Sequence, residues 1–377
     1  MNKLSVNMKL ASPAFVGGAD QSKAELRVAS LRGLLRFWWR AVQPPMTPTE
    51  LREKESRLFG STDTGQSKFL ARITEDKTRP LPTGTKVDNG IGYLGYGIAK
   101  YERGQGVRTV RDALDAGGEF TLQLLFKKGC EERKDELLDA LWCLTHLGGI
   151  GSRSRRGFGS LMVASVEGAD FPDLPRSPEE LKERIEEKFR NLRVGDRERL
   201  PDHTALSRHT AVVVWPLRAT SWQQALNSVG RELGAFRSSQ AEHPNFLDDR
   251  DLIKDYAFKG KPPTRSPERA AFGLPHNYFF KQEPNKKVDV NGAKHSRRAS
   301  PLFIHLHELR GGELAAVLSL IPAQFLPDGE QVKIGPAIET KGQREREVES
   351  ATFVPPPQDF TPVRDFLSNL DALEVKI

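Results

Sequence analysis

Cysteine is nearly absent from this sequence of 377 residues, which contains only Cys130 and Cys143. Two cysteines exclude a scaffold held together by several disulfides, and they cannot by themselves complete a structural zinc site. Long apolar runs are also missing, since no segment approaches the roughly 20 apolar residues of a membrane-spanning helix. The first twelve residues alternate polar and apolar side chains and lack the apolar stretch of a secretory signal. These absences predict a cytoplasmic protein with no membrane contact.

Acidic residues are fewer than basic ones: 50 Asp and Glu oppose 57 Lys and Arg, which gives a net charge of +7. Hydrophobic residues make up 37% of the chain, with 32 glycines in addition, and this composition excludes a disordered protein. The length predicts two or three domains. The basic excess is unevenly distributed, because residues 254–298 hold eleven basic and four acidic residues, a surplus as large as that of the whole chain.

The first half of the chain predicts the order βαββαβ, which is the ferredoxin-like arrangement. Apolar and polar residues alternate from Leu4 to Leu10, the period of a half-buried strand. Ser30 is a good N-cap for a helix that extends to Val42. The remaining elements are strands at 67–73, 119–126 and 161–166 and a helix at 132–147.

The second half predicts the same order again. A strand at 211–217 precedes a helix at 222–236 with apolar residues at spacings of three and four. We therefore predict an α+β protein with two ferredoxin-like domains, 1–168 and 208–377, joined by a connector at 169–207. The other expected elements are strands at 302–309, 314–321 and 373–377, a helix that begins with Thr361 and Pro362 as N-cap and N1, and a connector helix at 178–192.

Two long insertions interrupt these predicted domains. The first, at about 74–118, contains a glycine–tyrosine run at 91–97 that we interpret as a partly ordered binding loop, with a structural loop as the alternative. The second, at about 240–300, combines basic residues with aromatic ones, a composition that suits single-stranded nucleic acid. The alternative is a solvated loop whose aromatic residues lie in the core. The residues concerned are Lys294, Arg297 and Arg298 and the aromatics Tyr256, Phe258, Phe272, Tyr278, Phe279 and Phe280.

Three arginines form a stripe on the first predicted helix. Arg32, Arg36 and Arg40 are spaced four apart and so share one face. No acidic residue stands between Leu26 and Thr49, so these arginines have no partner within their own helix. The pattern predicts an external anion as their ligand. Carboxylates elsewhere in the fold, or a solvated face, are equally good alternatives.

A glycine–arginine loop, GGIGSRSRRGFGS, spans residues 148–160. It fails as a dinucleotide loop, because Ser154 occupies a required glycine position and the loop follows a helix instead of a strand. Glycine allows a close approach of the backbone to a ligand, and arginine offers forked donors to phosphate. We predict a flexible cationic loop for an extended phosphate backbone, with a plain connector as the alternative. Its candidate residues are Gly149, Gly151, Arg153, Arg155, Arg156, Gly157 and Gly159.

Catalytic patterns are weak in this sequence. His305 and His307 alternate on one strand and could form a metal pair, although a solvated sheet face is the favoured interpretation. His146 and His276 are candidates for a general acid or base, with helix capping as the favoured role of His146. We expect no cofactor and no metal.

Several motifs together resemble the RAMP superfamily, and within it the two-domain RAMP subunits, numbered first, of the type III-B (Cmr) CRISPR effector complex. The motifs are VGGADQ (16–21), SLRGLLRFWWRA (30–41), LFGS (58–61), the loop at 148–160, AFGLP (271–275) and RASPLFIHL (298–306).

This resemblance implies two ferredoxin-like domains and a subunit at the head of an RNA-guided complex. It implies that the loop at 148–160 lies against guide RNA, and that the chain contacts the 3′ part of the guide and the 5′ part of the target RNA. It also implies other Cmr-complex RAMP subunits as partners and a binding component with no enzymatic activity. The alternatives are a metal-independent endoribonuclease that processes guide RNA, with His146 or His276 as acid or base, and an RNA-binding protein that acts alone.

Overall fold

The computed structural model describes residues 2–20, 22–238, 245–281, 286–336 and 351–377. Its main sheets are antiparallel and are covered by helices, so the predicted α+β class is confirmed. None of the helices within these ranges is long and apolar enough to cross a membrane.

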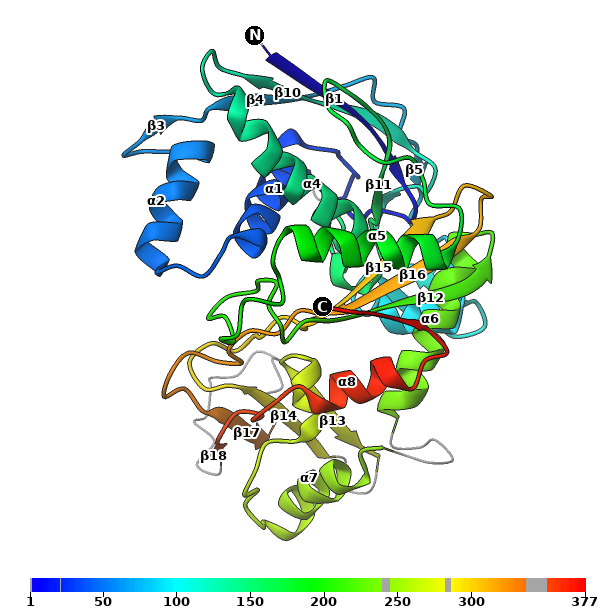
Figure 1. Cartoon of the computed structure of the whole chain (residues 1–377). Helices are drawn as coiled ribbons and strands as arrows, with labels where there is room; N and C mark the ends of the chain where they lie inside the picture. Colours follow the sequence, from blue (N-terminus) through cyan, green and yellow to red (C-terminus); the bar gives the residue numbers. More distant parts are fainter. Residues whose placement is uncertain (1, 21, 239–244, 282–285, 337–350) are drawn as a thin grey trace.

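The first sheet has four antiparallel strands in the order β11-β1-β10-β4. Buried residues alternate along its strands, so one face forms the core. Figure 1 shows α1 and α4 together under this face. The elements are β1 (Asn2–Leu10), α1 (Val28–Val42), β4 (Phe69–Thr74), β10 (Glu119–Phe126), α4 (Lys134–Leu147) after a 3-10 turn (Glu131–Arg133), and β11 (Leu161–Glu167).

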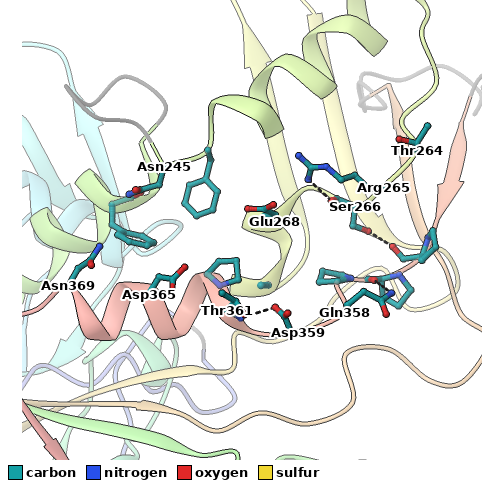
Figure 2. Close-up of a pocket in the computed structure, with 17 residues that line it drawn as sticks. Asn245, Thr264, Arg265, Ser266, Glu268, Gln358, Asp359, Thr361, Asp365 and Asn369 are labelled. Carbon is teal, nitrogen blue, oxygen red and sulfur yellow. Dashed lines mark hydrogen bonds between the residues drawn. The ribbon is translucent and has the colours of Figure 1, made fainter.

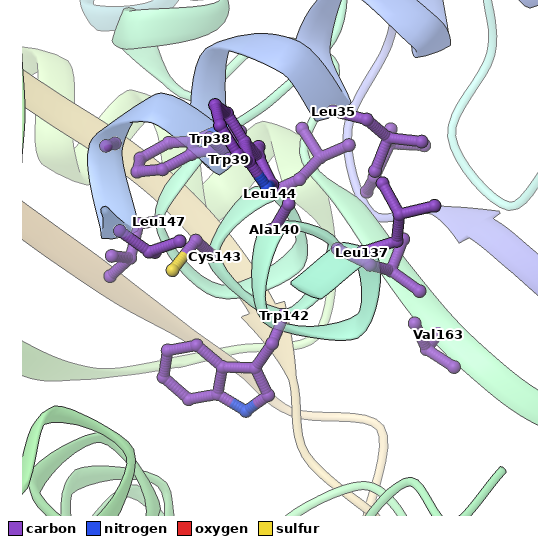
Figure 3. Close-up of a cluster of buried hydrophobic side chains, with 14 of the residues drawn as sticks. Leu35, Trp38, Trp39, Leu137, Ala140, Trp142, Cys143, Leu144, Leu147 and Val163 are labelled. Atoms are coloured by element: carbon purple, nitrogen blue, oxygen red, sulfur yellow. The ribbon is translucent and has the colours of Figure 1, made fainter. Parts of the chain in front are cut away.

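Helices α1 and α4 pack through large apolar side chains. Trp38 and Trp39 of α1 are buried and lie over Ala140 and Leu144 of α4 (Figure 3). The Trp39 indole N–H donates to a carboxylate oxygen of Glu136 at 2.8 Å, which satisfies the one polar atom of this buried ring. The helix begins at Val28, two residues before the predicted N-cap.

The second sheet also has four antiparallel strands, in the order β15-β16-β12-β19. Helices α6 and α8 cover one face, and α4 and α5 cover the other. The helix layer of the first half therefore serves both sheets (Figure 1), and nearly every residue of β15 and β16 is buried. The elements are α5 (Pro178–Asn191), β12 (Ala211–Ala219), α6 (Trp222–Arg237), β15 (Leu302–Glu308), β16 (Leu314–Leu320), α8 (Thr361–Ser368) and β19 (Leu373–Val375).

The predicted insertion at 240–300 is largely folded, although residues 239–244 and 282–285 lie outside the described part. It supplies helix α7 (Leu247–Lys259) and two strands of a third sheet. Neither the helix nor this sheet was expected from the sequence pattern. The order of this sheet is β13-β14-β17-β18, and its last two strands are too short for a clear alternation pattern. The strands are β13 (His276–Phe280), β14 (Lys286–Gly292), β17 (Val332–Pro336) and β18 (Thr352–Val354).

The insertion at 74–118 is ordered as well. The first part of its glycine–tyrosine run belongs to α3 (Asn89–Leu94), which packs on α6, so the run is ordered here and the expected partial order is wrong. The crossing is possible because Gly90 and Gly230 face each other: a Cβ on Gly230 would lie 2.0 Å from the carbonyl oxygen of Gly90. The short strands in and near this insertion are β2 (Gly60–Ser61), β3 (Gly65–Gln66), β5 (Pro80–Leu81), β6 (Lys86–Val87), β7 (Ala99–Glu102), β8 (Gly106–Thr109) and β9 (Ala113–Leu114).

Helix α2 (Pro48–Phe59) was not predicted, because few of its residues are apolar. A sequence signal for it exists. Thr47 accepts a hydrogen bond from the Glu50 backbone N–H, and the Glu50 carboxylate accepts one from the Thr47 backbone N–H. This reciprocal capping box, with proline at the first helical position, is a recognisable helix start. The helix brings Glu55 next to α1, with consequences for the arginine stripe.

Candidate nucleic-acid interface

The glycine–arginine loop lies between the two halves of the molecule. It leaves the end of α4, contacts β15 and returns into β11. Gly151, Gly157 and Gly159 have φ angles of 89°, 84° and 64°, which favour glycine. A Cβ on Gly157 would lie 2.5 Å from a methyl group of Leu226 and 3.2 Å from one of Ile304. The loop is therefore fixed by close packing against the second half, and the prediction that it is flexible is wrong.

The three arginines of this loop have different surroundings. Arg153 is exposed, with its guanidinium 6.0 Å from the centroid of the Tyr96 ring. Arg155 donates to the carbonyl oxygen of Ser300 at 2.6 Å and lies 4.3 Å from the centroid of the Phe303 ring. Arg155 thus helps to hold the two halves together. Among the described residues, no hydrogen bond or ring contact joins the Arg153 side chain to the second half of the molecule.

Arg156 is half-buried, and one of its terminal nitrogens is buried with no hydrogen-bond partner among the described residues. Burial and then the nearby charge of Arg237 lower the pKa of Arg156 to about 10. Burial and then Arg298 lower the pKa of Arg155 to about 10 as well. Both side chains remain charged at neutral pH, so positive charge accumulates here without a compensating acid.

Four further arginines surround the loop. Arg237 ends α6, Arg269 lies in a 3-10 turn (Glu268–Phe272), and Arg297 and Arg298 precede β15. The Nε atoms of Arg237, Arg269 and Arg298 are buried and lack a partner in the described part of the chain. Within that part, no carboxylate forms a salt bridge with any of these side chains. We call the following residues the arginine cluster: Arg153, Arg155, Arg156, Arg237, Arg269, Arg297 and Arg298.

Two members of the arginine cluster were missed by sequence reasoning. Arg237 and Arg269 both lie far from the glycine–arginine loop in the sequence. Arg269 was counted among the basic residues of 254–298 but was not named as a site residue, and no local motif marks Arg237. Arg237 even occupies the last turn of a helix, where a basic residue is ordinary. Only the packing of α6 and the 3-10 turn beside the loop brings these charges together.

The stripe on α1 is paired within the protein. Arg36 lies 2.6 Å and Arg40 3.0 Å from carboxylate oxygens of Glu55, whose side chain is only 9% exposed. Arg32 donates to the carbonyl oxygen of Phe59. The structure thus matches the alternative that we left open, pairing with a carboxylate elsewhere in the fold. Glu55 escaped notice because it lies beyond the segment between Leu26 and Thr49.

Replacing Glu55 by alanine should lower the free energy of unfolding by about 2 kcal/mol, because two half-buried guanidinium groups lose their shared carboxylate. Urea unfolding monitored by circular dichroism measures this change. Glu53→Ala is the matched control, since Glu53 pairs on the same helix with Arg57 at 3.7 Å and both side chains are well exposed. The control should cost no more than about 0.5 kcal/mol. Equal effects of the two substitutions would contradict the role of Glu55.

The other basic candidates lie at the end of the second insertion. Lys294 and Arg297 are exposed, and the Lys294 backbone N–H donates to Glu330 at 2.9 Å. The Arg298 side chain donates to the carbonyl oxygen of Gln324 at 3.3 Å. Arg297 lies close enough to Arg153 to lower its pKa, although burial is the larger cause. The exposed pair of Arg153 and Arg297 is thus accessible to a ligand.

The aromatic residues of this insertion serve mainly the core. Phe272, Tyr278 and Phe280 are buried, whereas the Phe279 side chain is 51% exposed. Tyr256 and Phe258 are half-buried. The alternative interpretation, aromatics that lie in the core, therefore describes most of them, and Phe279 has the exposure that base stacking requires.

The candidate catalytic histidines are buried. His146, His305 and His307 form a cluster between α4 and β15, with His146 and His307 ring centroids 4.9 Å apart. The expected solvated face of β15 is wrong, because α4 covers it. His146 stacks on Trp142, and its Nδ1 lies 2.9 Å from the Trp142 carbonyl oxygen. Burial is the main cause that lowers the pKa of His146 well below its usual value.

His276 is buried too, and burial followed by the charges of Arg269 and Arg237 lowers its pKa well below the usual value. Neither His146 nor His276 has the solvent access that an acid–base catalyst for RNA needs. Across the described residues, no three histidine, cysteine or carboxylate side chains are grouped as metal ligands would be.

A separate pocket of about 740 Å³ opens beside the start of α8 (Figure 2). Glu268, Asp359 and Asp365 line it. Its arginine, Arg265, is paired with Asp249 at 2.9 Å. Acidic side chains repel phosphate, so the lining of this pocket does not suit an RNA backbone.

Comparisons with known proteins agree with this architecture. A model described as the RAMP superfamily matches residues 7–162, from β1 through the glycine–arginine loop to β11. The CRISPR system Cmr subunit Cmr1-1 of Pyrococcus furiosus is 26% identical over 321 residues, which cover 81% of this chain and 82% of the relative.

Two solved structures share the fold. The apo crystal structure of Cmr1 from Pyrococcus furiosus matches with a TM-score of 0.58 and 17% identity, over 100% of this chain and 99% of that chain. A cryo-EM structure of the type III-B Cmr-beta bound to cognate target RNA matches with a TM-score of 0.50 and 13% identity, over 86% of this chain and 96% of that chain.

Proposed function

We propose that this chain is a member of the RAMP superfamily and a Cmr1-like, non-catalytic RNA-binding subunit of a type III-B CRISPR complex. The family match over residues 7–162 and the 26% identity to a Cmr subunit Cmr1-1 support this proposal. The observation that carries the proposal is the arginine cluster, in which four separate segments place seven guanidinium groups without a paired carboxylate in the described part of the chain. A concentration of positive charge of this kind attracts a phosphate backbone. The related type III-B Cmr-beta assembly was solved with cognate target RNA, which supports RNA as the ligand.

The proposed mechanism is electrostatic capture of the RNA backbone. The partners are guide RNA, target RNA and the other Cmr-complex RAMP subunits, with this chain at the head of the complex. It would contact the 3′ part of the guide and the 5′ part of the target. The chain would bind the charged phosphates of the RNA backbone. Base pairing between guide and target would supply the sequence specificity, as in other RNA-guided systems. The exposed Arg153 and Arg297 would contact phosphates directly, and Gly151 and Gly157 would shape the loop.

The same proposal includes two ferredoxin-like domains, at 1–168 and 208–377, with 169–207 as the connector. What supports it is the strand order. In each half, the strand that comes first in the sequence lies between the last and the third, and the second strand is at an edge. Both halves would then be copies of one βαββαβ unit, which pack through the helix layer of the first.

Replacing Arg153 and Arg297 by alanine should weaken binding of a single-stranded RNA and flatten its salt dependence, while stability stays unchanged because both side chains are exposed. Each lost phosphate contact reduces the log–log slope of affinity against salt by about 0.7 for single strands. Fluorescence anisotropy with a labelled RNA at several salt concentrations measures the slope. Arg57→Ala on α2 is the control for a lost surface charge. An unchanged slope in the double variant would remove these residues from the RNA site.

The proposed lack of catalytic activity has its own test. The buried state of His146 and His276 is the observation that speaks against the endoribonuclease alternative. Purified protein incubated with labelled repeat RNA in EDTA should leave the RNA intact. Specific cleavage that is lost in a His146→Ala variant would overturn the binding-only proposal. Co-purification with a guide RNA and other Cmr subunits distinguishes a subunit from an RNA-binding protein that acts alone.

A further inference from the structure

A pocket of about 480 Å³ lies where α3 of the first half meets α6 of the second. Its volume is within the range of small-ligand sites, about 300–1,000 Å³. It adjoins the arginine cluster, since two of that cluster's members line it. The lining residues that matter here are Tyr93, Gly230, Gly234, Ala235, Arg237 and Arg269.

Glycines give this pocket a flat wall. The close approach of Gly90 to Gly230 draws α3 onto α6, and a Cβ on Gly234 would lie 3.6 Å from the ring of Tyr93. The Tyr93 ring therefore lies along the glycine face of α6, and its side chain remains 39% exposed. An aromatic ring held in this way offers a stacking surface for a base.

Two arginines supply the charge. Arg237 donates to the Tyr93 hydroxyl at 3.0 Å, and its guanidinium lies 5.0 Å from the centroid of the Phe272 ring. The Arg269 guanidinium lies 5.6 Å from the centroid of the Tyr278 ring. Aromatic rings thus fix both guanidinium groups and exclude water on one side.

Neither of these arginines has a carboxylate partner among the residues that the structure describes. The neighbouring Asp249 is already occupied, because it accepts hydrogen bonds from the Arg265 side chain at 2.9 Å and from the backbone N–H groups of Glu268 and Arg269 at 2.9 and 2.8 Å. The Nε atoms of Arg237 and Arg269 are buried without a partner in the described part of the chain. So is a terminal nitrogen of Arg156, which lies near Arg237. Buried donors of like charge are costly unless an anion binds them.

We propose that this pocket binds one nucleotide of the bound RNA, with its phosphate held by Arg237 and Arg269 and its base against the ring of Tyr93. The inference rests on the proposed function and adds to it a discrete site between the two halves. One nucleotide turned into the pocket would fix the position of the RNA along the arginine cluster, which backbone charge alone cannot do. It would also connect α3 to α6 through the ligand.

Isothermal titration calorimetry of the full chain with uridine 5′-monophosphate tests the site, with uridine as the probe without a phosphate. The wild type should bind the nucleotide and should bind uridine about tenfold or more weakly, because only the phosphate meets the arginines. The variant Arg237→Gln/Arg269→Gln should weaken nucleotide binding by about tenfold or more, as expected for the loss of charge-assisted hydrogen bonds. The variant Arg57→Gln/Arg103→Gln removes the same charge elsewhere and should bind like the wild type.

A second variant distinguishes a loss of nucleotide binding from a loss of folding. Ala235→Trp fills the pocket and keeps both arginines, so it should abolish nucleotide binding while circular dichroism shows a folded chain. Unchanged nucleotide binding in both pocket variants would overturn the inference.

A parallel titration with a single-stranded RNA of about 24 nucleotides separates this inference from the proposed function, because it measures the whole basic surface. If the wild type binds the long RNA and not the mononucleotide, the inference is wrong and the proposed function stands. If the wild type binds the mononucleotide and not the long RNA, the proposed function is wrong, and the pocket is a site for a free nucleotide and not for a nucleotide of bound RNA.

Discussion

Lowering the pH from 7 to 5 is expected to lower the free energy of unfolding by about 4 kcal/mol through two buried histidines, His305 and His307. Burial, followed by the neighbouring His307, lowers the pKa of His305 to about 3. Burial is also the main cause that lowers the pKa of His307 to about 4, with a smaller contribution from the charge of Arg184 in α5. In the unfolded chain both imidazoles titrate near pH 6.5.

The sign follows from these values. Below pH 6.5 the unfolded chain binds protons that the folded chain does not. The stabilising contribution of the two histidines is therefore fully present above this pH, and it is lost as the pH falls toward 4. Each of the two histidines should contribute about 2 kcal/mol of this loss at pH 5. His146 lies in the same cluster and its pKa is shifted in the same direction, mainly by burial.

Urea unfolding at pH 7 and pH 5 measures the loss, and the His307→Gln variant identifies its origin. Glutamine does not titrate, so this variant should lose about 2 kcal/mol less than the wild type between the two pH values. The variant is compared with itself at each pH, so any change in packing cancels. Equal losses in the variant and the wild type would contradict the assignment to this cluster.

Replacing Gly230 by alanine should lower the free energy of unfolding by about 2–3 kcal/mol, even though alanine is the better helix former. The reason is the crossing of α3 and α6, where the new methyl group would lie 2.0 Å from the carbonyl oxygen of Gly90. The obstacle is backbone, which cannot move aside as a side chain would. Urea unfolding measures the loss, and limited proteolysis shows whether residues 74–118 become accessible.

Gly33→Ala is the matched control for this substitution. Gly33 lies in α1, and a Cβ there would have no atom within 4 Å. Alanine should therefore raise the free energy of unfolding by about 0.5–1 kcal/mol through helix propensity alone. Equal stability of Gly230→Ala and the wild type would mean that α3 does not pack on α6 as the structure shows.

The sequence predicted elements whose periodicity is clear and missed those whose signal is weak. Apolar residues alternate along the strand at Leu4–Leu10 and recur every three or four residues along the helix from Trp222. Both elements are present in the structure. The third sheet has no such pattern in its short strands β17 and β18. Helix α2 is mostly polar, and only its capping box marks its start.

The candidate site divides in the same way. The glycine–arginine loop was visible in the sequence, because its glycines and arginines all lie within the single segment 148–160. Its rigidity was not, since it depends on Leu226 and Ile304, which come from distant segments. The pairing of Glu55 with Arg36 and Arg40 depends on the packing of α2 against α1, and no pattern within α1 indicates it.

The sequence by itself determined the α+β class, the loop of glycines and arginines, and the resemblance to RAMP proteins, because these depend on local periodicity and contiguous motifs. Only the tertiary structure decided which arginines have a carboxylate partner among the described residues and which do not. Electrostatic pairing depends on distance in space. The fold pairs two arginines of α1 with one glutamate, and it brings Arg237 near both Arg156 and Arg269. The same packing buried the histidines that the sequence left as candidates for catalysis.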